Sequence, residues 1–215
     1  MCTIIGVPKR VDHAERRREI TDAVIHITLK GGLSAATFRE VAAEAGVSVR
    51  LVQYYFGTKD ELLLATQRQV AARSIERLRV WIAETDGSPR AWLGAFMSSF
   101  IPVDDETRVA MLMYVALHTE SLVHPELARS EAAEVPRTMR RTIVEQLRRG
   151  RTAADVDIDH EATMLTALVP SLGQSVLDGS MTADHAYELI DYALRRALPE
   201  DPRRKSRPAR VRGRG

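Results

Sequence analysis

Apolar residues recur every three to four positions along almost all of residues 13–198, which is the spacing of one face of an α-helix. Ile20, Ala23, Val24 and Ile27 form the first such stripe. No stretch alternates between apolar and polar residues for long enough to predict a β-strand. Glycine, proline and aspartate interrupt the pattern at intervals that suit helix ends. The sequence therefore predicts an all-α protein.

Four helices are expected in the N-terminal part of the chain. Gly31-Gly32 ends the first, because glycine tolerates the left-handed geometry of a helix C-cap. Thr37, Ser48 and Thr58 are suited to cap the other three, and a glutamate follows each threonine at capping-box distance. The fourth helix is long, and its buried stripe is expected to continue through Ala71, Ile75, Leu78 and Ile82.

Five further helices are expected after Pro89. The pattern predicts them at residues 89–101, 104–122, 125–149, 160–178 and 183–198. Asp159 and Thr182 are suited to be the N-caps of the last two, and Pro170 is expected to kink the helix that contains it. The chain should thus hold about nine helices.

Residues 38–57 have the spacing of a helix-turn-helix. Ala42 lies where the two helices would cross, and its small side chain permits a close approach. Gly46 falls at the turn, where a positive φ is needed. The apolar contacts that would fix the pair are Val41, Ala45, Val47, Val52 and Phe56. Many helical hairpins share this spacing, so the residues around it matter more.

Two segments carry a more specific pattern, TFREVAAEAGVS at residues 37–48 and YYFGTKDELL at residues 54–63. Over about residues 14–65 the chain resembles the DNA-binding domain of TetR-family transcriptional regulators. The remainder agrees in length and helix number with that family's ligand-binding and dimerisation domain, and around Leu165–Leu177 it is similar to the BetI-type subgroup. Gln53 departs from the family pattern, which most often has an aromatic residue there.

The second helix of the motif would enter the major groove of DNA. Arg50 can donate two hydrogen bonds to guanine and Gln53 can pair with adenine, each contributing ~1–3 kcal/mol of discrimination. Tyr54 and Tyr55 can donate their hydroxyls to phosphates, which positions the protein without reading the sequence. The resemblance implies DNA contacts for Thr37, Arg39, Ser48, Val49, Arg50, Gln53, Tyr54, Tyr55 and Lys59.

The helix starts give a reason for three of these contacts. Thr37 and Lys59 lie at the first turns of their helices, where free amides and the helix dipole favour a phosphate, and Arg39 can reach a phosphate or a base edge. Structural alternatives stay open: Tyr55 can lie at the edge of the core, and Arg50 and Lys59 can be solvated surface residues. Phe56 is expected to lie in the core. Arg16–Arg18 are expected to form a solvated face of the first helix.

Charge is distributed unevenly along the 215 residues, whose net charge is +2. Residues 1–59 carry a net charge of +3, residues 60–202 carry −8 and residues 203–215 carry +7. Only part of the chain is therefore expected to meet a polyanion. The basic end either adds salt-sensitive DNA affinity or is an inert solubilising segment.

These observations predict four regions. Residues 1–12 form a disordered arm, residues 13–60 a three-helix DNA-binding domain, residues 61–200 a larger helical ligand-binding and dimerisation domain, and residues 201–215 a basic disordered tail.

Residues 89–120 are rich in methionine and aromatic side chains, which is typical either of a packed core or of an apolar cavity for a small molecule. Polar groups within such a cavity would orient the ligand, and the acidic charge of this region favours a neutral or cationic effector. The candidate lining residues are Trp92, Phe96, Phe100, Met111, Tyr114, His118 and Gln174.

Helices 160–178 and 183–198 have apolar faces that pairing of two subunits would cover, giving a four-helix bundle with a two-fold axis. The alternative is that both pack on their own subunit. A two-fold axis would place two recognition helices in successive major grooves, ~34–36 Å apart, and so requires a palindromic operator. The resemblance implies the same dimer, and most often repression relieved by a small molecule.

An enzyme finds no support in the sequence, which contains neither a glycine-rich phosphate loop nor a Gly-x-Ser-x-Gly motif. The histidines lack zinc-ligand spacing, and the single Cys2 excludes a disulfide framework. Residues 155–159 begin like a calcium loop, but His160 and Thr166 occupy the positions of its glycine and glutamate. No metal or cofactor is therefore expected.

No apolar run approaches the ~18 residues of a membrane span, so a cytoplasmic location without membrane contact is expected. The sequence thus predicts a ligand-responsive DNA-binding transcriptional regulator, most often a repressor. The alternatives are a small all-α enzyme or carrier for an apolar molecule, without specific DNA recognition, and a helical adaptor protein.

Overall fold

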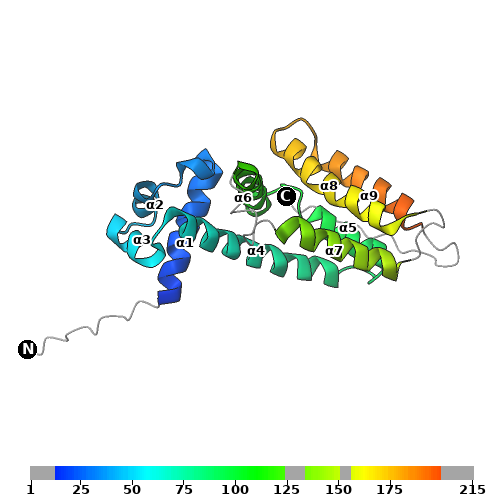
Figure 1. Cartoon of the computed structure of the whole chain (residues 1–215), viewed down its shortest axis with the longest axis horizontal. Coiled ribbons are helices and arrows are strands. Elements are labelled where there is room, and N and C mark those ends of the chain that lie inside the picture. Colours follow the sequence, from blue (N-terminus) through cyan, green and yellow to red (C-terminus); the bar gives the residue numbers. More distant parts are fainter. Residues whose placement is uncertain (1–12, 124–133, 151–155, 200–215) are drawn as a thin grey trace, which may run out of the picture. The chain divides into compact units, whose positions relative to one another are not determined.

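The computed structural model describes residues 13–123, 134–150 and 156–199, in which every regular element is helical (Figure 1). Nine α-helices and one short 3-10 helix follow one another in these residues. The chain forms two compact units that divide between Gln69 and Val70, and each is described by itself. The predicted all-α fold with about nine helices is confirmed.

The N-terminal unit contains three complete α-helices, a 3-10 helix and the first part of a fourth α-helix. These are α1 (His13–Gly31), η1 (Leu33–Ala35), α2 (Phe38–Glu44), α3 (Val49–Phe56) and α4 (Lys59–Ala83). Helix α2 packs against both α1 and α3. The buried core is Ile20, Ala23, Val24, Ala36, Val41, Ala42, Val52, Phe56 and Leu62. Three further predicted residues, Ile27, Ala45 and Val47, are partly buried and pack against it.

Side-chain caps start α2, α3 and α4 at the predicted residues. The Thr37 hydroxyl accepts a hydrogen bond from the Glu40 amide at 3.2 Å. The Ser48 and Thr58 hydroxyls accept in the same way, each at 3.2 Å, from the amides three residues later. Gly46 in the turn between α2 and α3 has φ 64°, as the helix-turn-helix spacing requires.

The C-terminal unit places its core among four helices, α5 (Pro89–Ser98), α7 (Glu134–Arg149), α8 (Ile158–Leu177) and α9 (Ala183–Ala197). Helix α8 packs against α7 and α9, and α5 packs against α7 and α9. Figure 1 shows α8 and α9 side by side in yellow and orange. Helix α6 (Asp105–Val123) packs against α8.

One detail of this unit differs from the sequence-based prediction. Asp159 is not the cap of α8: the carboxylate of Asp157 accepts the amides of Asp159 and His160 at 2.9 and 3.0 Å. Pro170 lies inside α8, as the sequence predicts. The helix expected from residue 125 is described only from Glu134, since residues 124–133 lie outside the described part of the chain.

The predicted buried stripe of α4 is wrong at Ala71 and Ile75. Ala71 is exposed and Ile75 is 52% exposed, whereas Leu78 packs against the core of the C-terminal unit. A helical period shows which residues share a face, but it does not show that another element covers that face.

Arg77 links this part of α4 to the start of α6. Its guanidinium forms ion pairs with Asp104 and, at 3.1 Å, with Glu106, and it lies 5.2 Å from the centre of a Trp81 ring. Asp104 also accepts the Thr107 amide at 2.9 Å. The hydrogen bond from Arg77 lowers the pKa of Asp104 from 3.8 to about 2, against the opposing effect of its partial burial.

The apolar faces of α8 and α9 are largely covered within one subunit. Leu165, Leu172, Ile190 and Leu194 are each at most 4% exposed and belong to the core of their own unit. For these four side chains, the alternative of packing on their own subunit therefore holds. Met164 on α8 and Tyr192 on α9 are instead 55% and 56% exposed.

Among residues 13–123, 134–150 and 156–199, the helices lack the combination of length and apolar character that crossing a lipid bilayer requires.

Candidate nucleic-acid interface

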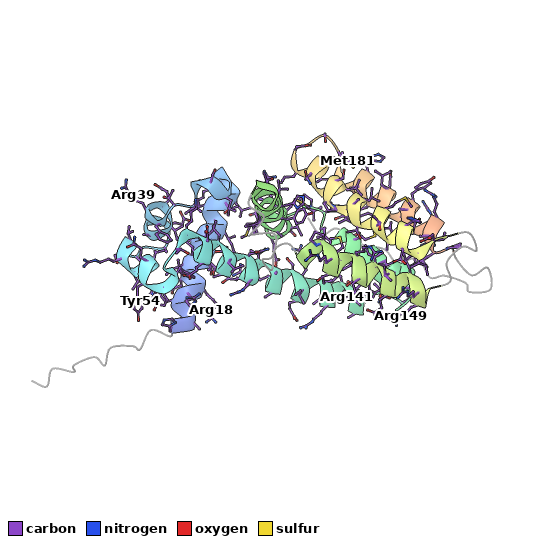
Figure 2. The ribbon with its side chains drawn as sticks, viewed as in Figure 1. Arg18, Arg39, Tyr54, Arg141, Arg149 and Met181 are labelled. Atoms are coloured by element: carbon purple, nitrogen blue, oxygen red, sulfur yellow. The ribbon has the colours of Figure 1, made fainter. Side chains whose placement is uncertain are left out.

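Helix α3 has one buried face and one polar face. Val52 and Phe56 are at most 2% exposed and anchor α3 in the N-terminal core. The opposite positions, Arg50 and Gln53, are exposed, and Tyr54 is 75% exposed. Figure 2 shows Tyr54 extending away from the helix. Because α3 is held through its apolar face, its polar side chains are presented to the outside without taking part in the core.

The start of α3 continues this surface. Ser48 is exposed and caps the helix, and Val49 beside it is 37% exposed. A small hydroxyl and a small apolar group at a helix N-terminus suit close approach to base edges and methyl groups. Together with Arg50, Gln53 and Tyr54, they place five of the nine predicted DNA-contacting residues on the outer side of one short segment.

Three more predicted residues lie at the starts of the flanking helices. Thr37 caps α2, Arg39 is exposed in the first turn of α2, and Lys59 is the exposed first residue of α4. Figure 2 shows the Arg39 side chain extending outward from α2. First-turn amides and cationic side chains favour an anion such as a phosphate.

Tyr55 lies between the core and the surface. It is half-buried, and its ring centre is 4.5 Å from that of His13 and 5.4 Å from that of Tyr54. Tyr55 therefore packs against neighbouring rings while part of its side chain stays accessible.

Arg17 is a residue that the sequence analysis placed on a solvated face of α1, and that placement is wrong. Its side chain is half-buried, donates a hydrogen bond to the backbone carbonyl of Tyr55, and lies 4.3 Å over the Phe56 ring. These contacts join α1 to residues 38 and 39 positions further along the chain. The local pattern of three adjacent arginines could not distinguish the middle one from its neighbours.

A polar network fixes α1 against α4 within the same unit. The Thr21 hydroxyl donates to the side-chain oxygen of Gln69 at 2.6 Å, and the Gln69 amide donates to Asp22 at 2.6 Å. Thr21 is 3% exposed, so leaving its hydroxyl without a partner would be costly. The scaffold behind α3 is therefore held by both apolar and polar contacts.

The predicted effector-binding residues of the C-terminal unit are only partly brought together. Trp92 stacks on Phe96 with ring centres 5.4 Å apart, and Phe96 meets Phe100 edge-on at 5.3 Å. Tyr114 stacks in parallel on His118 at 5.7 Å, and partial burial raises the pKa of the Tyr114 hydroxyl.

Met111 and Gln174 differ in their surroundings. Met111 is 4% exposed and lies against Gly173, where an added Cβ would be 2.2 Å from its terminal carbon. Gln174, the next residue of α8, is exposed. The five aromatic candidates thus form two separate groups of rings. Met111 is tightly packed, and Gln174 lies at the surface.

Comparison with known proteins decides the family. Residues 20–66 match the model described as "Bacterial regulatory proteins, tetR family". Residues 89–199, more than half of the chain, match the model described as "BetI-type transcriptional repressor, C-terminal". The chain belongs to the TetR family of transcriptional regulators. Its second unit is of the BetI type, and the family consists of DNA-binding regulators with a helix-turn-helix, not of enzymes.

Several curated relatives are regulators of the same kind. This TetR-family chain is 28% identical over 166 residues to the HTH-type transcriptional regulator PksA of Bacillus subtilis, covering 77% of the chain and 80% of PksA. It is 31% identical over 123 residues to BetI of Paraburkholderia phytofirmans, covering 57% of the chain and 63% of that protein. The chain thus matches less than two thirds of the length of that BetI.

Solved structures share the fold of this TetR-family protein. A transcriptional regulator from Rhodococcus sp. Rha1 superposes with a TM-score of 0.71 at 25% identity, over 83% of this chain and 93% of that one. A regulator from Saccharomonospora viridis, solved in complex with choline, has a TM-score of 0.71 at 24% identity, over 83% of this chain and 95% of that one.

Proposed function

We propose that this regulator is a dimeric repressor that a small molecule releases from a palindromic operator. The observation that carries the proposal is the polar, exposed face of α3 above a fully buried apolar face. Such a helix can be inserted into a major groove without loss of core contacts. Arg50 and Gln53 supply the specific base contacts, and Thr37, Arg39 and Lys59 contact phosphates.

Exposed side chains on α8 and α9 support the dimer. Met164 and Tyr192 are large, more than half exposed, and lie on two helices that pack together. Pairing of two copies would cover them, in a four-helix bundle with a two-fold axis. The two-fold axis would in turn present two α3 helices to a two-fold symmetric DNA site.

The effector is a small neutral or cationic molecule that contacts the aromatic side chains of α5 and α6. Trp92, Phe96 and Phe100 form a continuous row of rings, and aromatic faces attract organic cations. The acidic charge of residues 60–202 favours the same class of ligand. The structural relative from Saccharomonospora viridis binds choline, a quaternary ammonium compound, which makes choline the first compound to test.

Helix α4 gives the effector a route to the DNA-binding unit. It is one continuous helix from Lys59 to Ala83, and Arg77 in its second half is paired with Asp104 and Glu106 at the start of α6. An effector shifts the equilibrium only by its differential affinity for the two states, typically a coupling of ~1–3 kcal/mol.

Selection of bound fragments from a pool of random DNA tests this function. The wild-type protein should enrich a palindrome, and Arg50→Ala combined with Lys59→Ala should abolish the specific complex in a gel shift. The double variant Arg79→Ala and Arg141→Ala removes the same charge from exposed positions of the other unit and should leave the complex intact. Failure of the wild type to enrich any sequence would favour the carrier of an apolar molecule.

The effector is tested separately by adding choline to the preformed complex of the protein with its selected DNA. Release of the DNA at choline concentrations that do not disturb an unrelated protein–DNA complex is the expected result. No release by choline would rule out this ligand and leave the DNA-binding function as it stands.

A further inference from the structure

We infer that Arg17 of α1 is a positioning residue for DNA recognition, fixing the C-terminal end of α3 in the orientation that binds the operator. The inference rests on the proposed role of α3 in the major groove and adds a residue that itself contacts no base. The Arg17 side chain connects α1 to α3, two helices that are far apart in sequence.

The hydrogen bond from Arg17 satisfies a carbonyl at a helix end. The last four carbonyls of an α-helix have no partner within the helix, and Tyr55 supplies one of them in α3. The neighbouring carbonyls of Gln53 and Phe56 accept the backbone amides of Gly57 and Thr58. The Arg17 guanidinium donates a hydrogen bond to the Tyr55 carbonyl. This is the C-terminal end of the helix, where the helix dipole also favours a positive charge.

A second contact of Arg17 is with the ring of Phe56. The guanidinium carbon lies 4.3 Å from the ring centre, and Phe56 is 2% exposed. A planar guanidinium can stack on an aromatic face and donate hydrogen bonds from its edge at the same time, whereas an ammonium cannot stack in this way. Arg17 therefore holds both the backbone and the last side chain of α3.

The short length of α3 makes this anchor important. The helix has eight residues, and its N-terminal end follows directly from the turn after α2. Its C-terminal end is held by Phe56 in the core and by Arg17. Loss of Arg17 would leave α3 helical and anchored by Val52 and Phe56 but with one restraint fewer at its C-terminal end, so that a small tilt moves Gln53 and Tyr54 away from the base edges. Productive contacts require placement within roughly 0.5 Å and 10–20°.

The decisive measurement compares affinity for DNA fragments selected by the wild type with affinity for a random duplex of equal length. Arg17→Ala should lower the ratio of these affinities about tenfold, the result expected if only a tenth of the molecules keep the competent orientation. The slope of log affinity against log salt should stay unchanged. Arg17→Lys keeps the charge without the planar stack and should lower the ratio by a smaller factor.

Arg18→Ala is the matched control, because Arg18 is the exposed neighbour on the same helix and carries the same charge. Any phosphate attraction from Arg18 acts on both DNAs, so the ratio should equal that of the wild type. The inference is overturned if Arg17→Ala keeps the wild-type ratio, or if it weakens both DNAs equally while the salt slope falls by about 0.9, the signature of one lost phosphate contact.

Amide hydrogen exchange of the free protein tests the same anchor without DNA. In Arg17→Ala the amides of residues 53–57 should exchange faster, while those of α2 keep their wild-type protection. Equal exchange in wild type and variant would overturn the inference. Should the alanine variant lose its helix content, Arg17→Lys decides on the same two measurements. A wild type that selects no DNA would instead show that the proposed function is wrong.

Discussion

In the N-terminal unit, helices of seven and eight residues lie between side-chain caps and close over a small apolar core. In the C-terminal unit, helices of 10 to 20 residues enclose a larger core that contains Met97, Met139 and Phe96. Short helices have little stability of their own, so caps and close packing must fix them. Long helices with flexible methionines can adjust their packing around a ligand. The difference suits a rigid DNA reader combined with an adaptable sensor.

The largest effect should come from the core of the N-terminal unit. Phe56→Ala should cost about 3–5 kcal/mol of folding free energy, since Phe56 is almost fully buried. Tyr54→Ala, two positions earlier in the same helix and 75% exposed, should change stability by no more than about 0.5 kcal/mol and yet weaken DNA binding. Urea unfolding followed by circular dichroism measures both. Equal destabilisation by the two would contradict the division of α3 into a core face and a binding face.

Two separate glycine-to-alanine substitutions test the packing of the C-terminal unit. Gly173→Ala should destabilise by about 1–3 kcal/mol, because the new Cβ would meet Met111 and, at 3.1 Å, the Phe100 carbonyl. Gly94→Ala has its nearest neighbour, Leu194, at 3.8 Å and should stabilise by about 0.5–1 kcal/mol through its higher helix propensity. Thermal unfolding of the two variants should shift in opposite directions. A stabilising Gly173→Ala would show that α6 and α8 separate at little cost.

The caps allow the two units to be compared directly. Ser48→Ala and Thr182→Ala each remove a hydroxyl that accepts an amide at 3.2 Å, and each should cost about 1 kcal/mol. Because α3 has eight residues and α9 has 15, the local loss of amide protection should extend over the whole of α3 but only the first turn of α9. Protection lost throughout α9 would argue against the contrast between the units.

The smallest effect concerns the link between α4 and α6. The pKa of Asp104 is about 2 in the folded protein and 3.8 as an ordinary carboxyl, so its pairing stabilises fully above pH 4 and is lost as the pH falls through 2. The side chain is 42% exposed, so screening keeps the contribution below about 1 kcal/mol. Asp104→Asn should lower stability slightly at pH 7 and flatten its decline between pH 4 and pH 2.

Urea midpoints at pH 7, 4 and 2 measure this effect, with Asp105→Asn as the control at the neighbouring exposed position. If Asp105→Asn reduced the loss of stability at acid pH as strongly as Asp104→Asn does, the ion pair with Arg77 could not be the cause of that loss.

Features set by neighbouring residues could be predicted from the sequence. Thr37 and Ser48 were identified as caps because a hydroxyl followed by an amide three residues on is a local arrangement, and Gly46 because its turn needs a positive φ. Asp157 was missed as a cap because the alternating aspartates at 155–159 offer several equivalent starts.

Features set by distant residues could not be predicted. Arg17 differs from Arg18 only through its contacts with Tyr55 and Phe56, far along the chain. The periodicity of Leu165 and Ile190 identifies an apolar face but not the helices that cover it, so the sequence left open whether a second copy is needed.

The separation of faces on α3 has a consequence for how the protein can evolve. Ser48 aside, the outward positions Val49, Arg50, Gln53 and Tyr54 add nothing to the core, so replacing them costs little folding free energy. Mutations there can accumulate one at a time without loss of the domain, so under the proposed function the DNA-reading surface can change while the fold is kept. A duplicated copy of such a gene could acquire a new target before any other part of the protein had changed.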